Sequence, residues 1–191
     1  MEEFFAFCIG SVVVLIGLII LVIYSIYNSF QKSKKKIEER KKKTIEDLNN
    51  TANSYKDNYI RNRYEAIYAT TNILNNIIKY YNIEVLVIFL LDENNKCVNT
   101  KVIIGDTTKV TFSTDEIIAY SLENNAKKLI FAHNHPNNIS TPSDIDVLTG
   151  AELLSKFEEH NLVLSDLIVC CHNEYKSVLD SIRFKKITKE Y

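Results

Sequence analysis

The sequence has few cysteines and no excess of charge of either sign. Its 191 residues include 4 cysteines, at positions 8, 97, 170 and 171, and no CxxC pair occurs among them. This spacing excludes a small secreted module held together by disulfides, and it favours a reducing compartment. The formal net charge is -1 with 25% charged residues, so the composition gives no sign of a nucleic-acid-binding surface or of a strongly acidic partner.

Charged residues are absent from Phe4 to Tyr27, where almost every side chain is apolar. A helix of this length, at about 1.5 Å per residue, crosses a hydrocarbon core of about 30 Å. Glu2 and Glu3 stand where a cleaved signal peptide would carry basic residues, so we expect an uncleaved transmembrane anchor at residues 1–30. The lysine-rich run over residues 32–43 predicts a single-pass membrane protein with its N-terminus outside and its domain in the cytoplasm.

Glycine and proline are absent from residues 37–81, where apolar side chains recur mostly at every third or fourth position. This pattern predicts a long helix, so we interpret residues 31–81 as a basic flank followed by a helical stalk. The apolar stripe fits packing against the domain or against a second chain, and a homodimer through the stalk therefore stays an open alternative.

Residues 82–185 alternate short apolar runs with polar turns, which is typical of an α/β domain with a central sheet flanked by helices. Val85–Leu91 is apolar throughout and predicts a strand buried on both faces. A turn at residues 92–96 predicts a hairpin with the strand Val98–Ile104. The other predicted elements are a short strand at Val110–Phe112, a helix from Ser113 or Thr114 to Asn125, a strand at Leu129–Ala132, a helix from Pro142 or Ser143 to Glu159, and strands at Val163–Cys171 and Tyr175–Leu179.

Five polar residues form the pattern that carries chemistry. His133 and His135 lie two apart at the end of a predicted strand, so their side chains leave the backbone on the same side. Asp146 completes the motif H-x-H-x7-S-x-x-D, and two imidazoles with one carboxylate give a tetrahedral zinc ion three ligands and leave one position for water. Glu84, at the head of a buried strand, is the candidate base that takes the proton of that water.

Each of these residues also has a structural interpretation. Ser143 and Asp146 have the spacing of a helix capping box, which is compatible with metal binding because a helix N-terminus keeps the carboxylate ionised. Glu84 could simply begin a strand in solvent. Cys170, Cys171 and the neighbouring His172 are interpreted as structural residues at the end of a strand.

The motif resembles that of the JAMM or MPN metalloproteases, in which a glutamate precedes H-x-H-x7-S-x-x-D. The segments Glu84–Asp92 and Ala132–Pro136, with Thr141-Pro-Ser143 and Asp146, are most similar to the RadC-like branch of the JAB domain, over about residues 84–179. The resemblance implies a cytidine-deaminase-like fold at residues 82–185. It also implies a Zn²⁺ ion bound by His133, His135 and Asp146, Glu84 as acid and base, and Ser143 as a stabiliser of the oxyanion.

Two features depart from that family pattern. The helical, DNA-binding-like domain that usually precedes the RadC core is replaced by the predicted anchor and stalk, and residues 137–140 lack the usual glycine. We therefore expect a membrane-anchored, zinc-dependent metallopeptidase or isopeptidase acting on a peptide or protein substrate. The alternatives are a RadC-like JAB module that binds a partner without catalysis, and a DNA-associated protein, which the neutral composition disfavours.

Overall fold

The computed structural model describes residues 2–80, 82–171 and 174–188, and it describes side chains at residues 16–75, 82–171 and 174–188. The contacts divide the chain into two units, residues 1–45 and residues 46–191. Residues 2–45 of the helix α1 (Glu2–Asn53) belong to the first unit, and residues 46–53 of the same helix belong to the second.

The predicted transmembrane anchor at residues 1–30 is wrong, and so is the single-pass topology with an outer N-terminus and a cytoplasmic domain. Among the described residues, no helix combines the length and the apolar composition needed to cross a membrane. In the described part of α1, the uncharged residues pass directly into the lysine-rich residues 32–43 of the same helix. The side chains of residues 4–15 lie outside the described ones.

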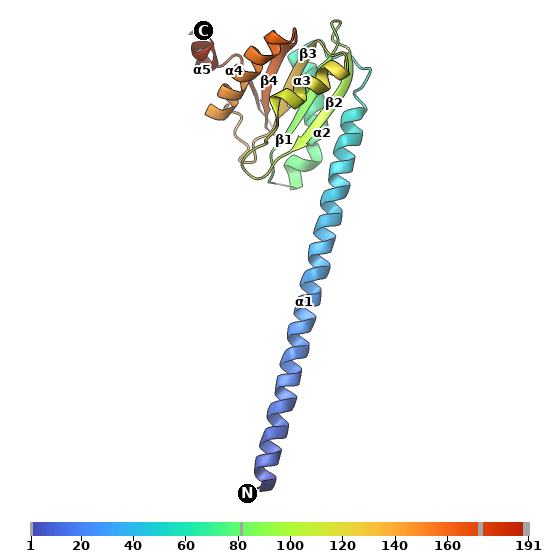
Figure 1. Cartoon of the computed structure of the whole chain (residues 1–191), viewed down its shortest axis with the longest axis vertical. Coiled ribbons are helices and arrows are strands. Elements are labelled where there is room, and N and C mark those ends of the chain that lie inside the picture. Colours follow the sequence, from blue (N-terminus) through green and yellow to red (C-terminus); the bar gives the residue numbers. More distant parts are fainter. Residues whose placement is uncertain (1, 81, 172–173, 189–191) are drawn as a thin grey trace. The chain divides into compact units, whose positions relative to one another are not determined.

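A five-stranded sheet in the order β2-β1-β3-β4-β5 forms the centre of the second unit (Figure 1). The strands are β1 (Val85–Leu91), β2 (Cys97–Ile104), β3 (Lys128–His133), β4 (Val163–Cys170) and β5 (Tyr175–Ser177). β1 pairs antiparallel with both β2 and β3, β3 pairs parallel with β4, and β4 pairs antiparallel with β5. The parallel pair requires a crossover connection between β3 and β4, and a helix supplies it.

Helices cover both faces of this sheet. They are α2 (Arg63–Tyr80), α3 (Thr114–Glu123), α4 (Asp144–Glu159) and α5 (Ile182–Ile187). Leu86, Ile88 and Leu90 of β1 belong to the hydrophobic cluster under α3, α4 and α5, whereas Val87 and Phe89 belong to the cluster under α2 and the end of α1 (Figure 1). All seven residues of β1 are buried, which confirms the predicted strand buried on both faces and the central sheet flanked by helices.

The helix predicted over residues 37–81 is interrupted between Asn53, the end of α1, and Arg63, the start of α2. Asp57 has a φ of 70°, which a helix cannot accommodate. Its N–H donates to the carbonyl of Cys97 at 2.8 Å, and the N–H of Ile60 donates to the carbonyl of Asn95 at 2.9 Å. The connection between the helices therefore pairs with the start of β2, a long-range contact that helical periodicity does not encode.

The predicted hairpin between β1 and β2 is confirmed, and its turn chemistry follows from two residues. Asp92 Oδ1 accepts hydrogen bonds from the N–H groups of Asn94 and Lys96, each at 2.8 Å. Asn95 has a φ of 64°, a left-handed conformation that asparagine tolerates better than most residues.

The strand predicted at Val110–Phe112 is wrong, because residues 105–113 form no helix or strand. Val110 and Phe112 instead pack against the cluster under α3 and α4. The Phe112 ring lies 5.8 Å from the ring of Phe131, centroid to centroid. Val110 and Phe112 are apolar because they pack on the core beside the sheet. A short apolar run in the sequence does not show whether its residues pair within a sheet or only pack against it.

Candidate metal centre

Two imidazoles meet where β3 leaves the sheet. His133 is the last residue of β3, opposite Leu86 of β1 and Val169 of β4, and is 4% exposed. His135 follows two residues later, and its Nε2 lies 3.2 Å from Nε2 of His133. The alternation of side chains along an extended chain therefore brings both rings to one side of the backbone, as their spacing predicts.

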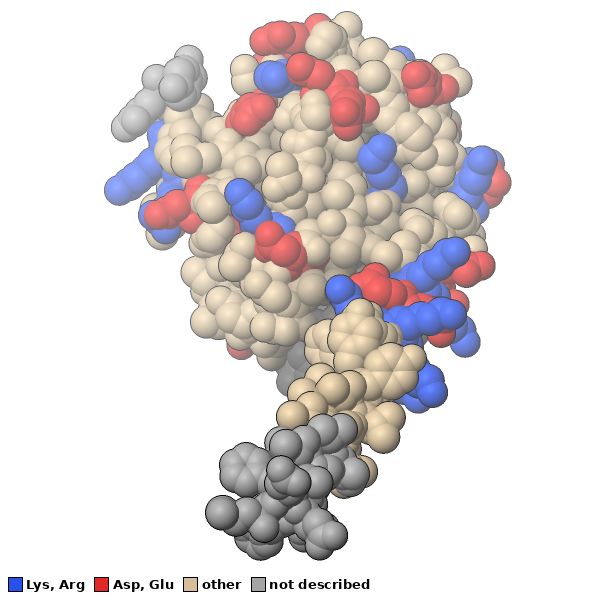
Figure 2. All heavy atoms as spheres, turned by 60° about the horizontal axis from the view of Figure 1, so that its bottom comes forward, with Lys and Arg blue, Asp and Glu red and all other residues tan. Residues whose placement is uncertain are grey.

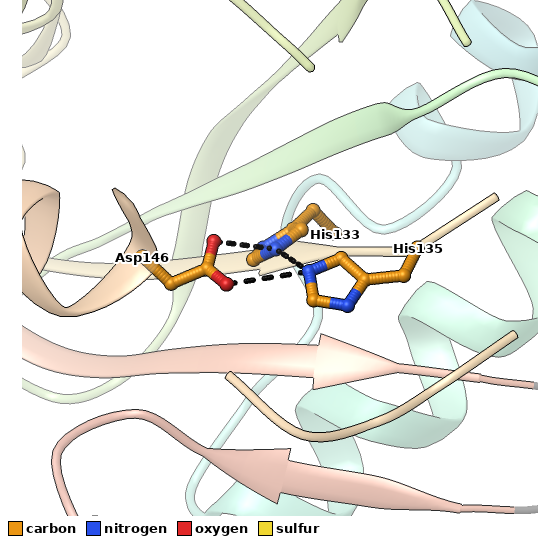
Figure 3. Close-up of side chains that lie close together, drawn as sticks. All are labelled: His133, His135 and Asp146. Atoms are coloured by element: carbon orange, nitrogen blue, oxygen red, sulfur yellow. Dashed lines mark hydrogen bonds and ion pairs between the residues drawn. The ribbon is translucent and has the colours of Figure 1, made fainter. Parts of the chain in front are cut away.

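Asp146 joins this pair from the first turn of α4. Its Oδ1 lies 3.0 Å from Nε2 of His133, and its Oδ2 lies 3.3 Å from Nε2 of His135. Figure 3 shows the carboxylate directed at both ring nitrogens from the opposite side. One donor atom from each of the three residues lies within 4.8 Å of the others, so His133, His135 and Asp146 could hold a metal ion.

The loop after His135 sets the orientation of that ring. His135 Nδ1 lies 2.8 Å from the carbonyl of Ile139, and a carbonyl can only accept, so Nδ1 carries the proton and the lone pair of Nε2 points at the site. Asn138 reaches a φ of 57° in this loop, which explains how the chain turns there without the usual glycine. Ser140, which is buried, donates to Glu174 Oε2 at 2.8 Å and holds the end of the loop.

The electrostatics of the cluster favour an ionised carboxylate. Burial opposes ionisation of Asp146, but its interactions with His133, His135 and Ser143 outweigh burial and hold its pKa well below the ordinary value. Burial likewise acts to lower the pKa of His135, but bonding to Asp146 and to the Ile139 carbonyl raises it overall. A metal ion at this site would therefore compete with a proton for the imidazole and carboxylate groups.

Glu84 lies at the same cavity as the three candidate ligands. It immediately precedes β1, and two residues that follow β2 hold its backbone. The N–H of Glu84 donates to the carbonyl of Asp106, and its carbonyl accepts from the N–H of Gly105, each at 2.8 Å. Gly105 is required there, because a Cβ atom would lie 2.2 Å from the carbonyl oxygen of Lys109. Burial raises the pKa of Glu84 above its usual value, although the two histidines and a backbone bond to Val110 act to lower it.

Asn134, between the two histidines, points to the other side of the backbone and is 3% exposed. Its Oδ1 accepts from the N–H of Val85 at 2.9 Å, and its Nδ2 donates to the carbonyl of Ile83 at 2.9 Å. Asn134 thus binds the two neighbours of Glu84 and links the candidate base to the candidate ligands. Asn134 was not among the residues predicted for the site, although strand alternation places it on the face opposite the histidines.

Ser143 is the N-cap of α4, and the predicted capping box is confirmed. Its Oγ accepts from the N–H of Asp146 at 3.2 Å, while its own N–H donates to Asp146 Oδ2 at 2.6 Å. The serine therefore helps to hold the carboxylate. Its hydroxyl proton is not used by either bond, and the residue lies at the cavity.

The cysteines near the end of β4 fit the structural interpretation. Cys170 and Cys171 are buried, and burial raises the pKa of Cys170 to about 12, far above that of a reactive thiol. The predicted role of His172 lies outside the described residues.

Comparison with known proteins shows which family has a similar sequence. A sequence profile of the RadC-like JAB domain matches residues 64–183, more than half of the chain. The chain is similar to a UPF0758 protein of Microcystis aeruginosa, with 32% identity over 107 residues that cover 56% of this chain and 44% of the relative. UPF0758 proteins of Pseudoalteromonas translucida and a Psychrobacter species match with 30% and 29% identity, over 45% and 51% of this chain and 39% and 44% of theirs. The chain spans less than half of the length of each relative, and their names state no activity.

Proposed function

Since the chain belongs to the RadC-like JAB domain family, we propose that it hydrolyses peptide or isopeptide bonds with a Zn²⁺ ion held by His133, His135 and Asp146. The observation that carries the proposal is the convergence of these three side chains on one point beside a partly buried glutamate. The finer fold assignment, a cytidine-deaminase-like domain at residues 82–185, is part of the same proposal.

The donor set and its spacing support zinc. At zinc-to-ligand distances of about 2.0–2.1 Å, neighbouring ligands of a tetrahedron lie roughly 3.3 Å apart. The two imidazole nitrogens lie 3.2 Å apart, close to this value. Each of them lies near a different oxygen of Asp146, with Oδ1 at 3.0 Å from His133 and Oδ2 at 3.3 Å from His135, and one of these oxygens would serve as the third ligand. Zinc bound there would polarise a water molecule and the substrate carbonyl.

In this mechanism Glu84 moves the proton. It takes a proton from the attacking water and later delivers it to the nitrogen of the leaving amine, so one carboxylate serves as base and then as acid. A base with a pKa near the working pH is the most effective, and burial shifts the pKa of Glu84 in that direction. Asn134 donates to the Ile83 carbonyl and accepts from the Val85 N–H, and these two bonds hold the backbone of Glu84 in place during the transfer.

Ser143 stabilises the developing oxyanion by donating its hydroxyl proton. Its Oγ already accepts from the N–H of Asp146, which fixes the oxygen and leaves the O–H bond to rotate toward the substrate. The residue thus holds a ligand through its backbone and contacts the substrate through its side chain.

The partner that the proposed activity requires is a peptide or protein substrate, and we do not expect a nucleic acid. On the face drawn in Figure 2, basic and acidic side chains lie interspersed rather than in one continuous basic surface, and the formal net charge is -1. A homodimer through residues 31–81 stays a prediction, which light scattering of the purified chain would test.

The test is turnover by the zinc-loaded 191-residue chain against panels of fluorogenic peptides and branched isopeptides. We expect hydrolysis by the wild type and a fall in kcat of at least about 100-fold for Glu84→Gln, with zinc content unchanged. Equal activity of the two proteins would refute the role of Glu84. Stoichiometric zinc with no turnover of any substrate would favour the alternative, a RadC-like JAB module that binds a partner without catalysis.

A further inference from the structure

A cavity of about 440 Å³ lies beside the candidate metal ligands, and most of the surface that lines it is apolar. Volumes of this size are typical of ligand-binding sites. His133, His135, Asp146 and Glu84 occupy one part of its lining. The apolar part of the lining includes Val110, Phe112, Phe131, Ile139, Ile145 and Leu167.

The apolar part has a buried floor and an exposed rim. Phe131 and Leu167 are 0% and 3% exposed, and they belong to the core between the sheet and the helices. Ile139 and Ile145 at the rim are 55% and 65% exposed. Isolated exposed isoleucines need no explanation, but two that line one cavity with an apolar floor form a continuous apolar surface open to solvent.

The rim is directly connected to the candidate metal ligands. Ile145 immediately precedes Asp146, and the carbonyl of Ile139 accepts the hydrogen bond of His135 Nδ1. A substrate bond positioned at the ligands therefore brings the adjoining residue of that substrate into the apolar part of the cavity. No long linker or second surface is needed to connect the two.

Charge argues against an ionic occupant. Among the described residues that line the cavity, Lys109 is the only lysine or arginine, and it is exposed, whereas Glu84 and Asp146 carry carboxyl groups. A charged substrate side chain would lose its hydration against Phe131 and Leu167. It would gain no free partner, because the proposed function already assigns Glu84 to proton transfer and Asp146 to the metal ion. An apolar side chain would be stabilised by the same contact.

We infer that the cavity is a specificity pocket for a bulky apolar residue, such as Leu or Phe, directly beside the substrate bond. This inference rests on the proposed function in taking the occupant to be a peptide. It commits to a class of sequence rather than to a particular substrate protein, and it assigns Ile139, Ile145 and Phe112 to substrate selection.

The test measures binding separately from turnover. Fluorescent hexapeptides that differ only in one central residue, Phe, Leu, Gly, Lys or Glu, are titrated into the zinc-loaded Glu84→Gln chain and followed by anisotropy. Burial of a Leu or Phe side chain predicts affinity on the order of 10- to 100-fold higher than for the Gly peptide. Equal affinities, higher affinity for the Lys or Glu peptide, or no binding of any peptide would overturn the inference.

A matched pair of variants locates the pocket. Ile145→Asn places a polar side chain at the rim and is expected to reduce the preference for Phe over Gly at least several-fold. Leu148→Asn changes a residue of the same helix that is 60% exposed and does not line the cavity, so the preference should persist. Equal effects of the two variants, with zinc content retained in both, would contradict the assignment.

The two proposals fail in different ways. Selective binding of the Phe peptide without any hydrolysis by the wild type would refute the peptidase activity and support the pocket. Hydrolysis without selection for an apolar residue would support the peptidase activity and overturn the pocket.

Discussion

Replacing Asn134 by alanine tests how the site is held together. The substitution removes the acceptor of the Val85 N–H and the donor to the Ile83 carbonyl, both at 2.9 Å. Val85 is 0% exposed, so its N–H is left without a partner, which costs about 1–3 kcal/mol. Ile83 is only partly buried, so water can replace the lost donor, and that loss adds about 0.5–1.5 kcal/mol. The free energy of unfolding should fall by about 2–4 kcal/mol.

The assay is urea unfolding of the metal-free chain, followed by far-ultraviolet circular dichroism because the sequence contains no tryptophan. The matched control is Asn99→Ala. Asn99 is a partly buried residue of the edge strand β2 that bonds Asn124 and the N–H of Thr100, so we expect a loss of about 1 kcal/mol or less.

A loss below about 1 kcal/mol for Asn134→Ala, or equal losses for the two variants, would refute the reasoning. The slope of free energy against urea should not change, because a changed slope would mean that the folded or unfolded state itself had altered. Under the proposed function, kcat of Asn134→Ala falls as well, because Glu84 lies between the two residues that Asn134 binds.

Three further predictions concern pH, a partly buried ion pair and the helix cap. In the metal-free chain, the raised pKa of His135 stabilises the folded state. This contribution is complete below the unfolded pKa near 6.5 and is lost as pH rises through the folded pKa, whereas zinc affinity grows over the same range. Melting temperatures should therefore fall with pH in the metal-free chain and rise in the zinc-loaded chain, and parallel trends would contradict this prediction. Arg63→Met leaves the carboxylate of Asp166, which is 4% exposed, without its cation. The free energy of unfolding should fall by about 2 kcal/mol, less than for a fully buried pair because Arg63 is partly exposed. Adding Asp166→Asn should restore most of the loss in urea unfolding, and no recovery would argue against the pairing. Ser143→Ala and Ser113→Ala should each lower the free energy of unfolding by about 1 kcal/mol, because both serines are N-caps. Only Ser143→Ala should also reduce turnover, and equal turnover of the two variants would remove Ser143 from the mechanism.

Part of the fold could be predicted because it depends on local patterns. The uninterrupted apolar run of β1 has no polar face, so it can only lie between two covered faces of a sheet. The turn at Asp92 and the cap at Ser143 are formed by side chains that bond their own neighbouring backbone.

The errors arose where a pattern had more than one physical solution. Residues 54–62 lie in a stretch with helical periodicity, yet they pair with residues at the start of β2, about forty positions away. Phe112 is apolar because it packs on Phe131, and the same residue type would have fitted a strand. The apolar run at Phe4–Tyr27 has the length of a membrane span in the sequence, yet no helix among the described residues is long and apolar enough to cross a membrane.

The sequence by itself determined which groups could act as metal ligands, because the spacing of His133 and His135 along an extended chain fixes a common side for both rings. Only the tertiary structure decided that Asp146 reaches them and that Glu84 lies at the same cavity, because α4 and β1 are brought together by the parallel pairing of β3 and β4 and by the antiparallel pairing of β1 and β3. It alone revealed Asn134 as the link between Glu84 and the histidines and the apolar pocket beside them, since both depend on contacts between segments far apart in the chain.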